Sequence, residues 1–242
     1  MNQYPANKRV EFQDLGLIAY KEAWDYQEKL FGAITELKKQ IGAGTSQELI
    51  TPNYLLFCEH NHVYTLGKSG SAQNLLVDNL QLKAKEAEFF RINRGGDITY
   101  HGPGQIIGYP ILNLEYFVNG IKEYIFKLEE PIIRLLYEYG IVANRLEGAT
   151  GVWLDVGSGS VRKICAIGVR TSRWVSMHGF ALNVNTHLDY FNYINPCGFT
   201  DKAVTSMQKE LGVEQDIDIV KTKLKKHIAD IFGMELVNEV PV

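Results

Sequence analysis

The chain has 242 residues, of which 45% are hydrophobic, and carries a formal net charge of -3 at pH 7. This composition allows one large hydrophobic core, and the charge gives no reason to expect nucleic acid as a partner. The first residues lack the apolar segment of a signal peptide and no run has the length of a membrane span, so we expect a cytosolic protein without membrane contacts.

The first predicted element is an amphipathic helix that opens the domain. Apolar residues recur at helical spacing from Tyr20 to Leu37, and Gly42 and Gly44 end the pattern. Shorter elements follow, with strand-like runs at 53–60, 63–67 and 89–93 and a charged helical patch at 80–88.

The second half of the chain predicts a long helix, several strands and a C-terminal helix. The long helix covers 121–139, where Pro131 should kink or split it. Strand patterns at 151–156 and 163–170 flank a glycine- and serine-rich stretch, 155–162, which is typical of a hairpin loop. A further strand pattern is at 179–185, and the end of the chain is helical from 217 to 231.

Strands and helices come in blocks with few regular βαβ alternations. This order favours an α+β fold with a mixed or antiparallel sheet flanked by helices. No repeat or low-complexity linker divides the chain, so we expect residues 1–242 to form a single catalytic domain.

The segment RINRGGDITYHGPGQIIGYPIL is rich in glycine. Gly95, Gly96, Gly102 and Gly104 remove side chains where a ligand or another backbone approaches closely, and Pro103 stiffens the turn. A phosphate-binding P-loop is a weak alternative because the GxxxxGK[ST] pattern is missing. A tight structural hairpin is the other alternative, but the polar side chains at positions 94, 99, 100, 101 and 105 favour a binding site.

The strand pattern at 163–170 begins with a lysine, which is unusual for an apolar strand. Simple alternation places Lys163, Cys165 and Ile167 on one face of this strand. A lysine at such a strand end most often points into water. His178, just before the next strand pattern, is by default a hydrogen-bonded structural histidine.

The three cysteines lie in different surroundings. Cys58 and Cys165 are flanked by apolar strand residues, where a free cysteine is commonly buried and inert. Cys197, between a proline and a glycine in polar company, is the candidate nucleophile. Cys58, His60 and His62 alternate as metal ligands might, but there is no CxxC spacing, and we expect no metal and no disulfide framework.

Four motifs in this order, RGGDITYHGPGQ, KICAIGVR, HGFALNVN and NPCG, closely resemble the lipoyl(octanoyl) transferase family. The resemblance covers about 59–199 and implies the fold of the biotin/lipoate protein ligases. It also implies transfer of an octanoyl group from octanoyl-acyl carrier protein to a lysine of a lipoyl domain, without a cofactor. The implied acceptors are the lipoyl domains of 2-oxoacid dehydrogenases and the glycine cleavage H protein.

The same resemblance implies the residues of the site. The acyl group is carried as a thioester on Cys197, and Lys163 is its catalytic partner. A thiol of pKa near 8.5 is only about 3% thiolate at pH 7, so a neighbouring ammonium that lowers this pKa raises the reactive fraction. The implied pocket residues are Arg94, Gly95, Gly96, Asp97, Ile98, Thr99, Tyr100, His101, Ala166, Ile167, Gly168, Gly179, Phe180 and Ala181.

Two other functions are compatible with this fold. An ATP-dependent lipoate-protein ligase also uses a strand lysine but needs no cysteine nucleophile, so Cys197 in NPCG argues against it. A non-catalytic binding protein would be expected to lack Lys163 or Cys197. Acyl carrier proteins are acidic, so the octanoyltransferase function also predicts a basic rim at the pocket mouth. Its expected members are Arg91, Arg94, Arg145, Arg162, Lys163, Arg170 and Arg173.

Overall fold

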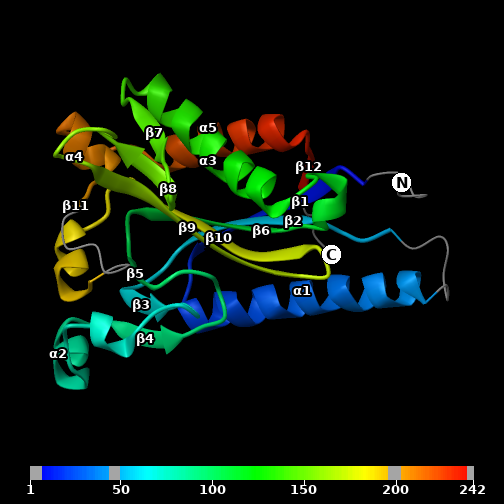
Figure 1. Ribbon diagram of the computed structural model, residues 1–242, viewed down its shortest axis with the longest axis horizontal. Helices are drawn as coiled ribbons and strands as arrows, with labels where there is room; N and C mark the ends of the chain where they lie inside the picture. Colours follow the sequence, from blue (N-terminus) through cyan, green and yellow to red (C-terminus); the bar gives the residue numbers. More distant parts are fainter. Residues whose placement is uncertain (1–6, 44–49, 196–202, 239–242) are drawn as a thin grey trace.

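The computed structural model describes residues 7–43, 50–195 and 203–238, which form a large mixed sheet, a small sheet and several helices (Figure 1). The strands are β1 (Arg9–Leu17), β2 (Tyr54–Glu59), β3 (Val63–Leu66), β4 (Glu88–Arg91), β5 (Ile98–His101), β6 (Gln105–Ile111), β7 (Ala143–Leu146), β8 (Ala149–Leu154), β9 (Arg162–Ser172), β10 (Val175–Asn183), β11 (Ala203–Val204) and β12 (Glu235–Asn238). The α-helices are α1 (Tyr20–Gly42), α2 (Asn79–Ala84), α3 (Ile121–Glu138), α4 (Met207–Leu211) and α5 (Ile217–Phe232). Three short 3-10 helices are η1 (Ala72–Asn74), η2 (Leu114–Tyr116) and η3 (Leu188–Tyr193). Within these ranges no helix is both long and apolar enough to cross a membrane.

The large sheet has the strand order β12-β1-β2-β6-β10-β9-β8-β7, with β11 added beside β9. Strand β1 runs parallel to both of its neighbours, whereas the pairs from β2 through β7 are antiparallel. The small sheet has the order β4-β3-β5. This confirms the α+β class with a mixed sheet and the hairpin between β8 and β9. That the whole range 1–242 forms one catalytic domain stays a prediction.

Helices cover both faces of the large sheet. In Figure 1, α3 and α5 lie above the sheet and α1 lies below it. Leu135 of α3 and Leu224 of α5 are fully buried in one core, and Ile34 of α1 packs with Met177 of β10 in the other. Each such side chain stabilises the fold by roughly 1.5 to 3 kcal/mol.

Two strands at the ends of the described chain were not predicted. Strand β1 precedes α1, so the expectation that this helix opens the domain is wrong, and β12 follows the last helix. The two strands pair with each other in parallel, with Arg9 opposite Glu235 and Phe12 opposite Asn238. Their local patterns are weak because each depends on a partner far away in the sequence.

The helix α3 runs unbroken through Pro131, so the expected split is wrong. A proline inside a helix removes one backbone hydrogen bond. Here Leu128, Ile132 and Leu135 on both sides of it are buried against the sheet. Their packing outweighs the lost bond, which the periodicity alone does not reveal.

Candidate active site

A pocket lies between the small sheet and one face of the large sheet, where β5, β9, β10 and β11 approach one another. It contains about 1000 Å³ of space, part of it open to solvent. Twelve of the fourteen predicted pocket residues line it: Arg94, Gly96, Asp97, Ile98, Thr99, His101, Ala166, Ile167, Gly168, Gly179, Phe180 and Ala181. Lys163 lines it as well. Further residues, which were not among the predicted pocket residues, also line the wall, namely Tyr20, Tyr109, Trp153, Asn183, Phe191 and the two residues of β11.

Tyr100 and Gly95 are the predicted pocket residues that lie outside this lining. Tyr100 is buried in a hydrophobic cluster beside the pocket, where its ring packs edge-on against Phe191 and its hydroxyl is 2.7 Å from Nδ1 of His62. Gly95 instead donates its N–H to the carbonyl of Val169 at 2.9 Å. This bond ties the glycine-rich loop to β9.

The glycines of the loop allow the close approach that the sequence predicts. A Cβ on Gly168 would lie 3.0 Å from the carbonyl oxygen of Gly95, so the loop and β9 touch through their backbones. At Gly104, where φ is +79°, a Cβ would lie 2.6 Å from the carbonyl oxygen of Asn185. Gly104 excludes a side chain for steric and conformational reasons, and at Gly168 a side chain would fit only if the loop gave way slightly.

Arg94 is buried and stabilises the same loop from inside. Its Nη2 donates to the carbonyl oxygen and the hydroxyl of Thr65, at 2.7 and 3.0 Å, and its Nη1 donates to the carbonyl of Gly95 at 2.9 Å. The guanidinium therefore brings a fixed positive charge to the pocket wall while holding β3 against the loop.

A β-bulge directs Lys163 into the pocket. Strand β8 pairs Val152 with Cys165 but Trp153 with Lys163, so β9 contains one extra residue, Ile164, at this point. The bulge resets the alternation, and Cys165 is fully buried in the core under α3 while Lys163 lines the pocket. The expectation that Lys163 and Cys165 share one face of the strand is therefore wrong.

The ammonium of Lys163 lies over an aromatic ring. Its Nζ is 4.4 Å from the ring centroid of Trp153, which is 2% exposed and whose Nε1 donates to the carbonyl of Ala149. On the neighbouring strand β8, Gly151 packs against the backbone of β9, because a Cβ there would lie 2.5 Å from the carbonyl oxygen of Cys165. The negative face of the indole attracts the ammonium and fixes its position in the wall.

A chain of buried amides forms the floor of the pocket. Asn183 donates from Nδ2 to the carbonyl of Thr205 at 2.9 Å, and its Oδ1 accepts from Nε2 of Gln105 at 2.8 Å. Oε1 of Gln105 therefore accepts from Nδ1 of His101, at 2.8 Å, and this fixes the tautomer of the histidine. Burial lowers the pKa of His101 to about 3, so the imidazole is neutral.

His178 is hydrogen-bonded, as expected, and also lines the pocket. Its Nε2 lies 2.8 Å from Oδ1 of Asn93, whose amide donates to Glu28, and Arg170 donates to the same carboxylate. Since the amide of Asn93 must donate to the carboxylate, Nε2 of His178 carries a proton. Burial lowers the pKa of His178 to about 3, and its φ of +60° shows that the wall imposes an unusual backbone conformation.

Cys58, Cys165 and His60 belong to the core, whereas His62 is half-buried. Cys58 and Cys165 are buried, as expected, and burial raises the pKa of both thiols, which disfavours the reactive thiolate. His60 contacts the hydroxyl of Tyr109 at 2.7 Å, whereas His62 contacts a different tyrosine and stacks on Tyr190. These contacts give both histidines structural roles.

Cys197 lies outside the described residues, so its role as nucleophile stays a prediction. The nearest described residues on either side border the pocket region. Before the segment 196–202, Asn195 donates to the carbonyl of Asn74, whose amide donates to Asp97 of the pocket at 2.6 Å. After it, β11 pairs in parallel with β9, with Val204 opposite Lys163.

Three of the seven expected members of the basic rim form ion pairs with carboxylates. Arg145 pairs with the carboxylates of Glu129 and Glu130, Arg162 with those of Asp155 and Glu210, and Arg170 with that of Glu28. Arg94 is buried, while Arg91 and Arg173 are exposed. The ion pairs of Arg145, Arg162 and Arg170 reduce the net positive charge that these three residues contribute. Attraction of an acidic partner by the whole set stays a prediction.

Three buried histidines make stability sensitive to acid. Burial lowers the pKa of His60 to about 4 and those of His101 and His178 to about 3, compared with about 6.5 in an unfolded chain. Below pH 6.5 only the unfolded state takes up these protons, so stability present at neutral pH is lost as the pH falls. We expect the free energy of unfolding in urea to decrease by about 1.4 kcal/mol per pH unit for each histidine.

The check is urea unfolding at several pH values between 7 and 5. His60→Gln should flatten the dependence by the share of one proton. Equal slopes in the wild type and in His60→Gln would contradict the burial of a neutral histidine at this position.

Known proteins resemble this chain in both sequence and fold. Residues 19–229 match the family described as the lipoyl protein ligase A/B catalytic domain. An octanoyltransferase of Flavobacterium johnsoniae is 58% identical over 232 residues, which are 96% of this chain and 100% of the relative. One of Christiangramia forsetii is 57% identical over 95% of this chain and 98% of the relative. The solved bipartite lipoate protein ligase of Thermoplasma acidophilum has a TM-score of 0.68 at 16% identity, over 99% of this chain and 88% of that one, which confirms the predicted fold.

Proposed function

The chain belongs to the lipoyl protein ligase A/B catalytic-domain family, and we propose that it is an octanoyltransferase that takes its acyl group from octanoyl-acyl carrier protein. It holds the octanoyl group as a thioester on Cys197 and passes it to a lysine of a lipoyl domain, in lipoate biosynthesis. The acceptors are the lipoyl domains of 2-oxoacid dehydrogenases and the glycine cleavage H protein, and the enzyme acts in the cytosol.

The observation that carries the proposal is the place of Lys163. The lysine lines a pocket whose wall continues directly into β11, and β11 follows the segment that contains Cys197. An ammonium in a partly enclosed pocket can both attract a thiolate and exchange protons with reacting groups.

The two half-reactions balance with one lysine and one thiol. In the first, the thiolate of Cys197 attacks the carbonyl carbon of the donor thioester, and the carrier's thiolate leaves with a proton from the ammonium of Lys163. In the second, the acceptor amine attacks the enzyme thioester, Lys163 takes the amine proton, and the thiolate of Cys197 leaves. The lysine and the thiolate are thereby restored.

The apolar part of the wall suits an acyl chain. Ile167 and Phe180 contribute side chains, and Gly168 and Gly179 leave space beside them. Gly179 cannot carry a side chain, since a Cβ would lie 2.1 Å from the carbonyl oxygen of Gly108. Each buried CH₂ of the acyl chain stabilises the complex by about 0.8 kcal/mol.

Intact mass spectrometry tests this function. The protein is mixed with octanoyl-acyl carrier protein in the absence of ATP, and we expect one octanoyl adduct, located on Cys197 by peptide mapping. The adduct should disappear when a lipoyl domain is added, as the octanoyl group appears on that domain. Transfer that requires ATP and proceeds without any enzyme adduct would favour the lipoate-protein ligase.

A further inference from the structure

Strand β11 forms part of the pocket wall although it has only two residues. Strand β10 pairs with β9 as far as Leu182 opposite Cys165, and beyond this point β11 takes the place beside β9. Ala203 lies opposite Arg162, Val204 lies opposite Lys163, and both residues of β11 line the pocket. The wall next to Lys163 therefore depends on how firmly β11 is held.

The backbone bonds of β11 are few, so side chains must contribute to its position. The N–H of Thr205 donates to the carbonyl of Lys163 at 2.9 Å, and the carbonyl of Thr205 accepts from the amide of Asn183. The hydroxyl of Thr205 donates to Oε1 of Glu210 on α4. Thr205 is fully buried and links β11 to both the pocket floor and α4.

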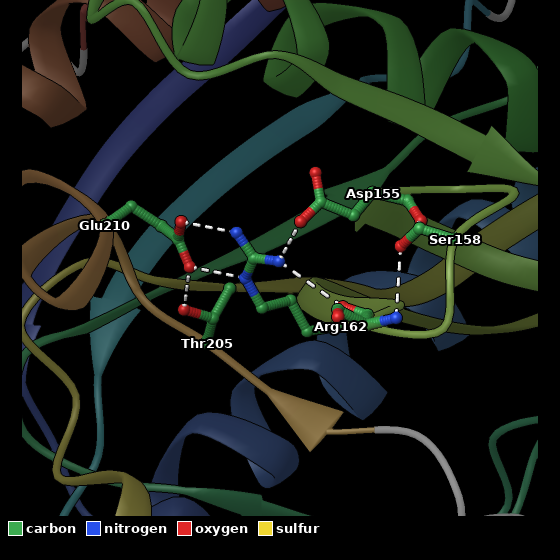
Figure 2. A network of polar contacts seen from close by, with 6 residues as sticks. Asp155, Ser158, Arg162, Thr205 and Glu210 are labelled. Carbon is green, nitrogen blue, oxygen red and sulfur yellow. Dashed lines mark hydrogen bonds and ion pairs between the residues drawn. The ribbon is translucent and has the colours of Figure 1, made fainter.

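Glu210 also binds Arg162, the residue before Lys163. Figure 2 shows the guanidinium between the carboxylates of Glu210 and Asp155. Its Nε and Nη2 each donate to an oxygen of Glu210 at 2.7 Å, and its Nη1 donates to Asp155. The side chains of Arg162 and Glu210 are only 23% and 16% exposed. A bidentate, largely buried ion pair of this kind is stronger and more directional than an ion pair on the surface.

We propose that Glu210 is a positioning residue for Lys163. Its carboxylate joins Arg162, which precedes the lysine on β9, to Thr205, which follows β11, and so fixes the two sides of the pocket wall against each other. Glu210 itself does not line the pocket, so it acts through these neighbours. The inference rests on the proposed function.

The neighbouring contacts explain why small displacements would matter. Lys163 is fixed on its other side by the ring of Trp153, 4.4 Å away. If β11 is loosened, Lys163 keeps its contact with Trp153, but the wall formed by β11 moves relative to the ammonium. A displacement of about 1 Å between reacting groups can slow a reaction by about a hundredfold.

The test is Glu210→Gln, which keeps the shape of the side chain and removes its charge. We expect the rate of Cys197 acylation at saturating octanoyl-acyl carrier protein to fall by about ten- to a hundredfold, with KM changed less than about twofold. Glu138→Gln is the matched control, because Glu138 also binds two side chains, Lys223 and His227, but joins α3 to α5. That variant should acylate at the wild-type rate.

A double-mutant cycle separates positioning from independent effects. If Arg162 and Glu210 act as one unit, the variant with both Arg162→Gln and Glu210→Gln should be no slower than the slower single variant. Losses that multiply would overturn the inference. So would a wild-type rate in Glu210→Gln, a change confined to KM, or a loss that only follows the unfolded fraction seen by circular dichroism.

The failure of this inference can be distinguished from failure of the proposed function. A wild-type protein that forms no acyl adduct contradicts the proposed function, whereas an acylated wild type with an equally fast Glu210→Gln contradicts only the role of Glu210. If Glu210→Gln does not fold, Thr205→Val replaces it, since valine has the same shape without the hydroxyl. The same loss in rate with unchanged KM is then expected, and a wild-type rate overturns the proposal.

Discussion

Replacing Cys197 by serine is expected to abolish octanoyl transfer. A serine hydroxyl is far less acidic than a thiol and is a poor nucleophile without a strong base, so no acyl-enzyme should form. Loss of the group that forms a covalent intermediate typically lowers kcat by a factor on the order of 10³ to 10⁶. Transfer is measured with octanoyl-acyl carrier protein and a lipoyl domain, and the adduct by intact mass spectrometry.

Cys58→Ser and Cys165→Ser are the matched controls, because both thiols are buried. Each control should still form the adduct on Cys197, and any loss of activity should follow a loss of stability. Rapid transfer by Cys197→Ser, or an octanoyl group on either buried cysteine, would contradict the covalent mechanism.

Lys163→Ala should slow both half-reactions by about 10² to 10⁴, the usual contribution of a general acid–base group. It should also raise the pKa of the Cys197 thiol, because the thiolate loses an opposite charge in its vicinity. The first effect is measured by single-turnover transfer, and the second by the pH dependence of thiol alkylation. The Cys197→Ser protein supplies the alkylation background of the two buried thiols.

Lys163→Arg separates the two roles of the lysine. Arginine keeps the positive charge but does not release its proton in a protein. The pH at which alkylation of Cys197 is half-maximal should therefore remain near that of the wild type, while octanoyl transfer stays slow. Lys209→Ala, on the exposed surface of α4, should change neither quantity. An alkylation midpoint that is the same in wild type and Lys163→Ala would place the ammonium out of reach of the thiol.

The motifs predict most of the pocket wall because they occur on chain segments that lie next to one another around it. Gly168 approaches the backbone of Gly95 in the glycine loop and pairs with Gly179 across β9 and β10. Amphipathic spacing also predicts α1, α3 and α5, since the buried stripe of each helix follows from local periodicity.

Features that depend on distant partners could not be predicted in the same way. The face that Lys163 presents is set by a bulge opposite Trp153, and alternation along a single strand contains no information about a register shift. Glu210 lies outside every motif, and its importance becomes visible only when α4 packs beside Arg162. Phe191 likewise reaches the pocket through the short helix η3, for which no periodic signal exists.

The pairing of β1 with β12 has a consequence for the order of assembly. On the ribosome β1 is synthesised early, but its parallel partner emerges more than two hundred residues later, as the pairing of Val10 with Leu236 shows. Until then one side of β1 has unpaired backbone N–H and C=O groups, which are prone to pair with other chains. Pairing over such a long sequence separation is slow. The nascent chain thus exposes an aggregation-prone edge during synthesis, and its protection by a chaperone would matter most in that interval.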